Sequence, residues 1–388
     1  MKKTLFYILY LIVIVFAILE VAIRFVTETN KANIEMVLGK SHRYLLPLPS
    51  AVDKCHSESI EGDAKNKYRI FHDTLGWSHG SWGQDSTEYP LYANNKGIRI
   101  TKSDFENRVV AKDKYNIITI GNSFTHSDFV TAEESWPQLI QEKTGRSVAN
   151  LGVGGYGIHQ ALLRLMISNI KADTVLFGVI YGDFDRALDP VYTFYQGGCK
   201  TKPIFEFEED SYKLINVPVL KPSEFCEAKQ KHTHPIFEHI PGFSDYIYSD
   251  SWWTHSYVLR LIVSLRHQNK LLSGMPIYLT NDESLDYCIN IFELFHKYCE
   301  QNGMYGKVVL LDAGENFRHK ELYHLSNPWD LVNAKLEARG IPHVDFHDEL
   351  YKAFLEKPEN LIHPIEKLHY SPKGNQEVCK LILKDLKL

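Results

Sequence analysis

The sequence has little of what a nucleic-acid-binding protein needs. Its 388 residues carry 43 Lys and Arg against 48 Asp and Glu, a formal net charge of -5, and the basic residues form no long run. Because a phosphate backbone is bound by concentrated positive charge, we expect no nucleic-acid partner. The sequence also has no internal repeat. With 44% hydrophobic and 23% charged residues, its composition is that of an ordinary globular protein.

Cysteine is scarce, and all six cysteines lie after the N-terminal apolar segment. This placement is compatible with an oxidising compartment. Cys288 and Cys299 fall in one expected helix about 16 Å apart, which is too far for a disulfide. Cys199 and Cys226 bracket a polar insertion and are the best candidates for a disulfide. Buried thiols are the alternative for them.

The chain has one long apolar run, and it lies at the N-terminus. Leu5 to Leu19 are all apolar, and the run continues to Val26 with only Glu20 and Arg24 interrupting it. Its length lies between that of a signal-peptide core and that of a spanning helix. No A-x-A-like cleavage site follows, so we expect residues 1–26 to be a retained transmembrane anchor. A cleaved signal segment is the alternative.

Two lysines, Lys2 and Lys3, precede the apolar run. The positive-inside tendency keeps such residues in the cytoplasm. The sequence therefore predicts a single-pass protein whose chain from about residue 27 onward is extracytoplasmic, in a periplasm or at a cell surface.

Composition divides the rest of the chain into two parts. Residues 27–112 are polar and irregular, with strand-like fragments at Tyr68–His72 and Pro90–Tyr92, and we expect them to form an extension that packs on the main domain. Residues 113–388 form that domain. An insertion at about 187–280, rich in aromatic residues, Pro and His, interrupts it and is expected to form a lid or substrate wall.

Apolar runs and amphipathic stretches alternate along the main domain, which predicts βαβ units. The fold class that follows is α/β, a flavodoxin-like three-layer sandwich with a central parallel sheet of about five strands, plus the N-terminal transmembrane helix. The expected strands are Asn116–Ile120, Ser147–Leu151, Thr174–Tyr181, Lys307–Leu311 and Pro342–Phe346. The expected helices are Glu133–Lys143, Ile158–Ile170, Leu285–Gln301, Trp329–Ala338, Asp348–Leu355 and Asn375–Leu386.

The first chemical motif is Gly121-Asn122-Ser123-Phe124-Thr125, which follows the first expected strand. Ligands of open α/β sheets bind at the carboxyl ends of strands, so Ser123 lies where chemistry is expected. The structural alternative is a serine that caps a helix in an ordinary strand-to-helix turn.

The second motif lies near the C-terminus, where Glu366 precedes His369 by three residues in a loop that leads into a helix. A neutral imidazole can take a proton from a nucleophile and return it to a leaving group, provided that an acceptor fixes its tautomer. Glu366 is the expected acceptor. A single histidine among 18 is more often a surface or packing residue.

Together, the two motifs resemble the first and last blocks of the SGNH hydrolases, also called GDSL esterases. The resemblance covers roughly residues 113–388, and it extends to Asn94-Asn95-Lys96-Gly97-Ile98-Arg99, which is similar to a segment found upstream of the serine block in membrane-anchored members. It implies a triad of Ser123, His369 and Glu366. Glu366 stands where the family usually has Asp, and Asp345 or Asp348 is an alternative acid.

The same resemblance implies an oxyanion hole from two middle blocks. Gly155, within Asn150-Leu151-Gly152-Val153-Gly154-Gly155-Tyr156-Gly157, falls where a backbone N–H would face the oxyanion. The third block lacks its usual Asn, and Asp183 or Gly182 occupies that position. We place Asp183 in the oxyanion hole, although a carboxylate donates a hydrogen bond only when it is protonated.

Two other readings compete with ester chemistry. Gly152, Gly154 and Gly157 match the dinucleotide-binding G-x-G-x-x-G pattern, with Asp173 about twenty residues on. However, the motif follows the second strand and Asp173 precedes the third, so this match is weak.

A metal site is the other competing reading, because the insertion contains a group of histidines and acidic residues. They lack a strong ligand spacing and have no Cys pair beside them, so a solvated loop is the better interpretation. The residues are His232, His234, Glu238, His239 and Asp245. We therefore expect neither a metal nor a cofactor.

The function expected from the resemblance and the location is that of a serine esterase or O-acyltransferase. Its substrate would be an acylated carbohydrate or envelope polysaccharide, with acetyl as the acyl group and another membrane protein as a possible acyl donor. Aromatic residues of the insertion are candidates to stack on sugars: Tyr192, Phe194, Tyr195, Trp252 and Trp253. The alternative is a catalytically weakened SGNH-fold scaffold that binds glycan or an assembly partner, since the third-block Asn is missing.

Overall fold

The computed structural model describes most of the chain in two compact units. The described residues are 2–29, 35–38, 45–46, 68–85, 89–192, 194, 198–208, 211–231, 234–241, 243, 252–271, 276–312, 314–365 and 368–388. The first unit, here called the anchor unit, comprises Met1–Ile60, Val191–Thr201 and Leu220–Met275. The second, the sheet unit, comprises Glu61–Pro190, Lys202–Val219 and Pro276–Leu388.

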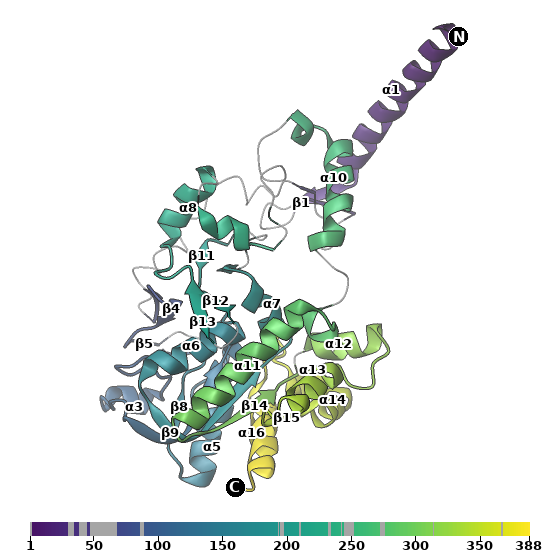
Figure 1. Ribbon diagram of the computed structural model, residues 1–388. Helices are drawn as coiled ribbons and strands as arrows, with labels where there is room; N and C mark the ends of the chain where they lie inside the picture. Colours follow the sequence, from purple (N-terminus) through teal and green to yellow (C-terminus); the bar gives the residue numbers. More distant parts are fainter. Residues whose placement is uncertain are drawn as a thin grey trace. The chain divides into compact units, whose positions relative to one another are not determined.

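A five-stranded, fully parallel sheet forms the centre of the sheet unit (Figure 1). Its order, β15-β14-β9-β7-β8, is the doubly wound flavodoxin-like order when the strands are numbered along the chain. The predicted fold class is therefore confirmed. The strands are β7 (Lys114–Gly121), β8 (Val148–Asn150), β9 (Lys171–Val179), β14 (Tyr305–Leu310) and β15 (His343–Asp345).

Helices cover both faces of the sheet. On one face α6 (Ile158–Ser168) packs against α11 (Glu283–Gln301), and the ring of Phe177 in β9 lies 5.5 Å from that of Phe292 in α11. On the other face α5 (Trp136–Thr144) packs against α16 (Pro372–Leu386), over a core that includes Ile117 and Leu176. Burial of these apolar stripes holds the three layers together.

Further helices connect and close the layers. Each predicted helix overlaps an observed one, whereas others, such as the short α7 and the polar α12, were not predicted. The further helices of the sheet unit are α3 (Lys102–Glu106), α4 (Ser123–His126), α7 (Gly182–Leu188), η5 (Ile277–Leu279), α12 (Gly314–Leu322), α13 (Asp330–Ala338), α14 (His347–Glu356) and α15 (Pro358–Leu361).

Three small antiparallel pairs complete the sheet unit. They are β3 (Arg69–His72) with β4 (Gly76–His79), β5 (Gly83–Gln84) with β6 (Leu91–Tyr92), and β12 (Ile204–Phe207) with β13 (Tyr212–Ile215). The segment that follows β6 reaches the main sheet, because the backbone N–H of Arg99 donates to the carbonyl of Asn150 over 3.1 Å. This contact brings residues before 113 to the carboxyl end of β8.

The anchor unit has its own apolar cluster, which includes Phe194, Phe225 and Phe237. Cys199 is a buried thiol in this cluster, whereas Cys226 is disulfide-bonded. The expected Cys199–Cys226 disulfide is therefore wrong, because both side chains pack in the same apolar cluster but Cys226 bonds to a cysteine other than Cys199. The elements are α1 (Lys2–Phe25), β1 (Thr27–Thr29), β2 (Glu35–Val37), β10 (Val191–Tyr192), β11 (Lys200–Thr201), α8 (Pro222–Lys231), η3 (Pro235–His239), η4 (Trp252–His255) and α10 (Tyr257–Leu271).

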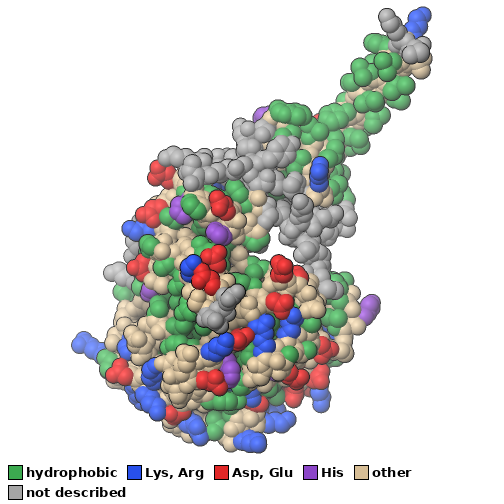
Figure 2. Space-filling view, in the orientation of Figure 1, with side chains coloured by type: hydrophobic (Ala, Val, Ile, Leu, Met, Phe, Trp, Pro, Cys, Tyr) green, Lys and Arg blue, Asp and Glu red, His purple; other side chains and the backbone are tan. Residues whose placement is uncertain are grey.

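Among the described residues, α1 is the helix that is long and apolar enough to cross a membrane, over Lys3–Phe25. Its apolar side chains are exposed, and Figure 2 shows them as a green surface along the helix. A membrane anchor and a signal sequence both fit this description.

Candidate active site

Ser123 is the first residue of α4, directly beyond the carboxyl end of β7. The helix cap is Asn122, whose Oδ1 accepts from the backbone N–H of Phe124 over 2.7 Å. The alternative in which Ser123 itself caps the helix is therefore wrong, and its hydroxyl is left for another partner. Gly121 precedes the turn with φ of +149°, and a Cβ there would collide with the side chain of Thr125. Only glycine permits this tight approach.

The hydroxyl of Ser123 meets the imidazole of His369. The distance from His369 Nε2 to Ser123 Oγ is 2.7 Å, and both side chains are largely buried. The imidazole lies near the rings of Phe124 and Phe129, with centroids 4.8 Å and 5.0 Å away. The backbone N–H of His363 donates to the carbonyl of His369 over 2.8 Å and holds the loop. The fold thus brings the two sequence motifs into one hydrogen-bonded pair.

The predicted acid, Glu366, lies outside the described residues. Of the two alternatives, Asp345 is engaged elsewhere, since its Oδ2 accepts from the side-chain amides of Asn327 and Asn333 over 2.6 Å and 2.8 Å. Asp348 is exposed on α14. Neither carboxylate shows a contact with the histidine of the site, so Glu366 stays the prediction for this role.

Asp183, the predicted third-block residue, acts as an acceptor at the carboxyl end of β9. Its carboxylate accepts from the side-chain amide of Asn122, from the backbone N–H of Ile180 over 3.0 Å, and from Arg186 over 2.8 Å. Burial raises the pKa of Asp183 to about 6, although Arg186 opposes this shift. The predicted role of Asp183 in the oxyanion hole requires that its carboxyl be protonated. The three hydrogen-bond donors favour the ionised form instead, so this role stays a prediction.

Gly155 lies in the loop after β8 with φ of +82°. The loop is joined to the Ser123 turn, since the backbone N–H of Val153 donates to the carbonyl of Gly121 over 3.1 Å and Asn150 donates to the carbonyl of Thr125 over 3.0 Å. Within the part of the chain that the structure describes, no group accepts from the backbone N–H of Gly155. The loop is thus tied to the nucleophile turn, and the role of the Gly155 N–H as an oxyanion donor stays a prediction.

The glycines of the dinucleotide-like pattern pack the chain closely. A Cβ on Gly152 would collide with the backbone of His126, and one on Gly157 would lie 3.0 Å from Arg186. Asp173 lies near the start of β9 and pairs with Lys114 over 2.8 Å. This is the amino end of the parallel strands, whereas the glycines follow the carboxyl end of β8. The loop therefore has a packing role, and the position of Asp173 relative to the glycines does not match a dinucleotide site.

A buried polar network beside Ser123 was missed by the sequence analysis. His126 contacts the hydroxyl of Tyr68 through Nε2 over 2.7 Å and the carboxylate of Asp128 through Nδ1. Burial lowers the pKa of His126 to about 4, so we infer a neutral ring that donates to Asp128 and accepts from Tyr68. Burial would raise the pKa of Asp128, but the hydrogen bond from His126 and the nearby charge of Arg69 hold it well below its usual range.

The upstream motif that ends at Arg99 is tied to the same turn. The buried guanidinium of Arg99 donates to the carbonyls of His126, Ser127 and Val130, the last two over 2.6 Å and 2.5 Å. Asn94 shapes the motif itself, because its Oδ1 accepts from the backbone N–H of Ile98 over 3.2 Å. Through Arg99, the motif holds in place the segment that follows Ser123.

The aromatic residues of the insertion differ in exposure. Phe194 and Trp253 are buried, Tyr192 is partly buried, and Trp252 is 78% exposed. Tyr195 lies outside the described residues. Sugar stacking is thus not available to Phe194 and Trp253.

The histidine group of the insertion is only partly described. His232 and Asp245 lie outside the described residues, while Nδ1 of His234 accepts from the backbone N–H of Ile236 over 3.2 Å and caps η3. Glu238 and His239 belong to η3. Over the described residues, no group of three or more His, Cys, Asp or Glu is placed to hold a metal ion.

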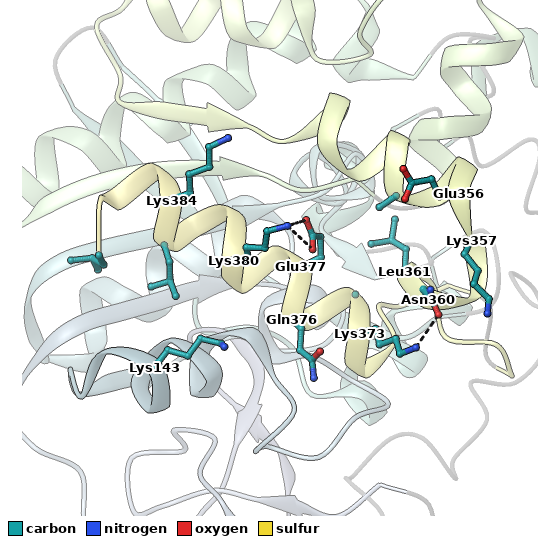
Figure 3. Close-up of a pocket in the computed structure, with 14 residues that line it drawn as sticks. Lys143, Glu356, Lys357, Asn360, Leu361, Lys373, Gln376, Glu377, Lys380 and Lys384 are labelled. Atoms are coloured by element: carbon teal, nitrogen blue, oxygen red, sulfur yellow. Dashed lines mark hydrogen bonds and ion pairs between the residues drawn. The ribbon is translucent and has the colours of Figure 1, made fainter.

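A cavity of about 720 Å³ runs along α16 and does not include Ser123 or His369 (Figure 3). Five lysines line it, but Lys380 pairs with Glu377 and Lys373 contacts Asn360. The lysine side chains spread along the helix and to both sides of it, so their charges do not converge on one point. The lysines are Lys143, Lys357, Lys373, Lys380 and Lys384.

No family model and no curated protein matches the chain. Solved structures similar to it include a protein of the lipolytic G-D-S-L family from Desulfitobacterium hafniense DCB-2, with 13% identity, coverage of 70% of this chain and 99% of that one, and a TM-score of 0.35. A G-D-S-L lipolytic protein from Veillonella parvula DSM 2008 has 9% identity, 69% and 96% coverage, and a TM-score of 0.35. The α/β hydrolase LAE5, from the metagenome of Lake Arreo in Spain, has 12% identity, 71% and 94% coverage, and a TM-score of 0.36. At these values no residue role is transferred to this chain.

Proposed function

We propose that this protein is a serine esterase or O-acyltransferase of the SGNH type, with Ser123 as nucleophile and His369 as base. The observation that carries the proposal is the 2.7 Å contact between His369 Nε2 and Ser123 Oγ, which joins two motifs 246 residues apart. A serine hydroxyl is a weak nucleophile until an adjacent base takes its proton. Asn122 caps α4 and Arg99 braces the segment after it, so the hydroxyl is held for this contact.

The proposed reaction has two steps. The Ser123 oxygen forms a bond to the ester carbonyl while its proton passes to His369, and His369 then protonates the departing alcohol. In the second step the oxygen of water or of a sugar hydroxyl attacks the acyl carbonyl and gives its proton to His369, which returns a proton to the Ser123 oxygen as the acyl–serine bond breaks. Glu366 is proposed to orient His369, and the backbone N–H of Gly155 is proposed to stabilise the oxyanion.

The proposed substrate is an acylated cell-envelope carbohydrate, with acetyl as the acyl group. It rests on the family resemblance and on the proposed location, since the apolar helix α1 is long enough to anchor the protein in a membrane. The proposed location is extracytoplasmic, supported by Lys2 and Lys3 ahead of α1. A membrane protein is the proposed acyl donor if transfer rather than hydrolysis takes place.

A glycan-binding scaffold is the second candidate function. It is favoured by Asp183, which stands where the resemblance implies an amide donor and which accepts rather than donates hydrogen bonds. Loss of one oxyanion donor costs about a hundredfold or more in rate. Tight glycan binding without turnover would support this candidate.

The test is turnover of p-nitrophenyl acetate by the full chain in detergent. Wild type is compared with Ser123→Ala and with Ser103→Ala, a matched change on the exposed helix α3. The proposal predicts turnover in wild type and Ser103→Ala and near-background turnover in Ser123→Ala. Equal rates in all three proteins would contradict it.

A further inference from the structure

Glu20, in the last turns of α1, caps a second helix of the anchor unit. Its carboxylate accepts from the backbone N–H groups of Tyr257 and Val258 over 2.8 Å and 3.0 Å, and from the Ser256 hydroxyl over 2.9 Å. These N–H groups begin α10. The first N–H groups of a helix have no partner within it and carry the positive end of its dipole, so a carboxylate stabilises them.

Other contacts reinforce this junction. The guanidinium of Arg24 lies 4.7 Å from the centre of the Tyr257 ring and donates to the carbonyl of His255 over 3.4 Å. Further along α10, Arg260 pairs with Glu35 of β2 over 2.6 Å, and the Tyr257 hydroxyl donates to the same carboxylate over 2.6 Å. The two polar residues that interrupt the N-terminal apolar run therefore both serve the fold. Removal of α1 would leave the start of α10 without its cap.

Trp252 lies one turn of η4 before His255, the residue that Arg24 contacts. Its side chain is 78% exposed, and most of the apolar side chains of α1 are exposed as well. The contacts of Glu20 with the N–H groups of Tyr257 and Val258 place the start of α10, which follows η4 directly in the chain, beside the last turns of α1 (Figure 1). Exposed tryptophan next to a spanning helix is typical of a membrane interface, where the ring sits at the headgroup level.

We infer that α1 is a permanent part of the folded protein and that its last turns, together with Trp252, seat the anchor unit on a phospholipid bilayer. This inference rests on the proposed membrane attachment and is independent of the ester chemistry. A signal segment that is removed would take Glu20 with it, whereas a retained helix keeps the cap and holds Trp252 at the bilayer surface.

The bilayer contact is tested with the full chain in phosphatidylcholine nanodiscs, with and without bromine near the carbonyl end of the acyl chains. Bromine quenches tryptophan fluorescence on contact. Quenching is expected in wild type and in Trp82→Phe, a control in the sheet unit, and most of it should disappear in Trp252→Phe. Equal quenching in wild type and Trp252→Phe, or none in either, would overturn the inference.

The cap is tested by two further measurements. The intact mass of protein extracted from membranes should include α1, and Glu20→Ala should lower the unfolding midpoint by about 2 to 4 °C. Glu28→Gln, an exposed change in β1, is the matched control and should have no effect. A mature chain that lacks Glu20, or equal midpoints for all three proteins, would overturn the inference. Ester turnover should be unchanged in each variant, so failure of the proposed chemistry is a separate result.

Discussion

Asp128 and Asp183 both contact the turn that holds Ser123, but their surroundings shift their pKa values in opposite directions. The backbone N–H of Asp128 donates to the Ser123 carbonyl over 2.9 Å, and its side chain lies beside His126. Asp183 accepts from Asn122, and burial raises its pKa to about 6 despite Arg186. The hydrogen bond from His126 and the charge of Arg69 keep Asp128 ionised, whereas burial dominates at Asp183. Environments that separate two such groups are a feature of active sites.

Among the variants that test these surroundings, His369→Asn is expected to have the largest effect on turnover. Both carboxylates and His126 remain in this variant, so it tests whether any of them replaces the base. We expect kcat for p-nitrophenyl acetate to fall by about 10³-fold or more, because loss of the base leaves the serine inactive. His255→Asn, an exposed change in the anchor unit, should keep wild-type turnover. Wild-type turnover in His369→Asn would assign the proton transfer to another group.

The acid is expected to have the next largest effect. Glu366→Gln should lower kcat by about 10² to 10⁴-fold, since an amide does not stabilise the imidazolium as a carboxylate does. Asp348→Asn is the matched control on the exposed side of α14 and should leave kcat unchanged. A large loss of kcat in Asp348→Asn with unchanged kcat in Glu366→Gln would instead assign the role of the acid to Asp348 on α14.

Asp128→Asn should lower the free energy of unfolding at neutral pH by about 2 to 4 kcal/mol, because it removes one partner of a partly buried pair. A carboxyl whose pKa is lowered by folding contributes stability above its unfolded pKa and loses it as pH falls toward the folded value. The difference from wild type in urea titrations should therefore be full at pH 5 to 7 and shrink below about pH 4. A difference that does not change with pH would show that the charge of Asp128 is not the cause.

Asp183→Asn should give the reverse pH dependence. A carboxyl whose pKa is raised by folding contributes stability below its unfolded pKa, and this contribution is lost as pH rises through the folded value. Because folding raises the pKa of Asp183 from 3.8 to about 6, the stability of wild type relative to the variant should fall by about 2 kcal/mol between pH 4 and pH 7. The measurement is the change with pH of the difference in unfolding free energy between wild type and Asp183→Asn, taken from urea titrations. The new amide does not titrate, so it adds only a constant to this difference. A flat difference over this range would contradict the raised pKa.

The sheet and the Ser–His pair were predictable because their signals are local. A short apolar run marks each strand, the Ser123 motif directly follows one of these strands, and the His369 motif directly precedes a helix. The parallel order then brings strand ends to one edge of the sheet. The polar network of Tyr68, His126 and Asp128 was not predictable, because no spacing in the sequence connects the residue before β3 with the end of α4 and the segment that follows it.

The anchor unit was harder to predict for a related reason. Its parts come from three separate stretches of the chain, and the contact between Glu20 and the start of α10 spans more than two hundred residues. In the sequence Glu20 is only a polar interruption of an apolar run, whereas in the structure it caps another helix. Cys199 was expected in a disulfide from its position beside the insertion, but its side chain packs among phenylalanines instead.

The most direct test of the account is labelling of the full chain with a fluorophosphonate, followed by peptide mapping. The account predicts a single phosphonylated residue, Ser123, in wild type, no label in Ser123→Ala, and much slower labelling in His369→Asn. Absence of label on folded wild type, or equal labelling of wild type and Ser123→Ala, would contradict the claim that His369 activates Ser123.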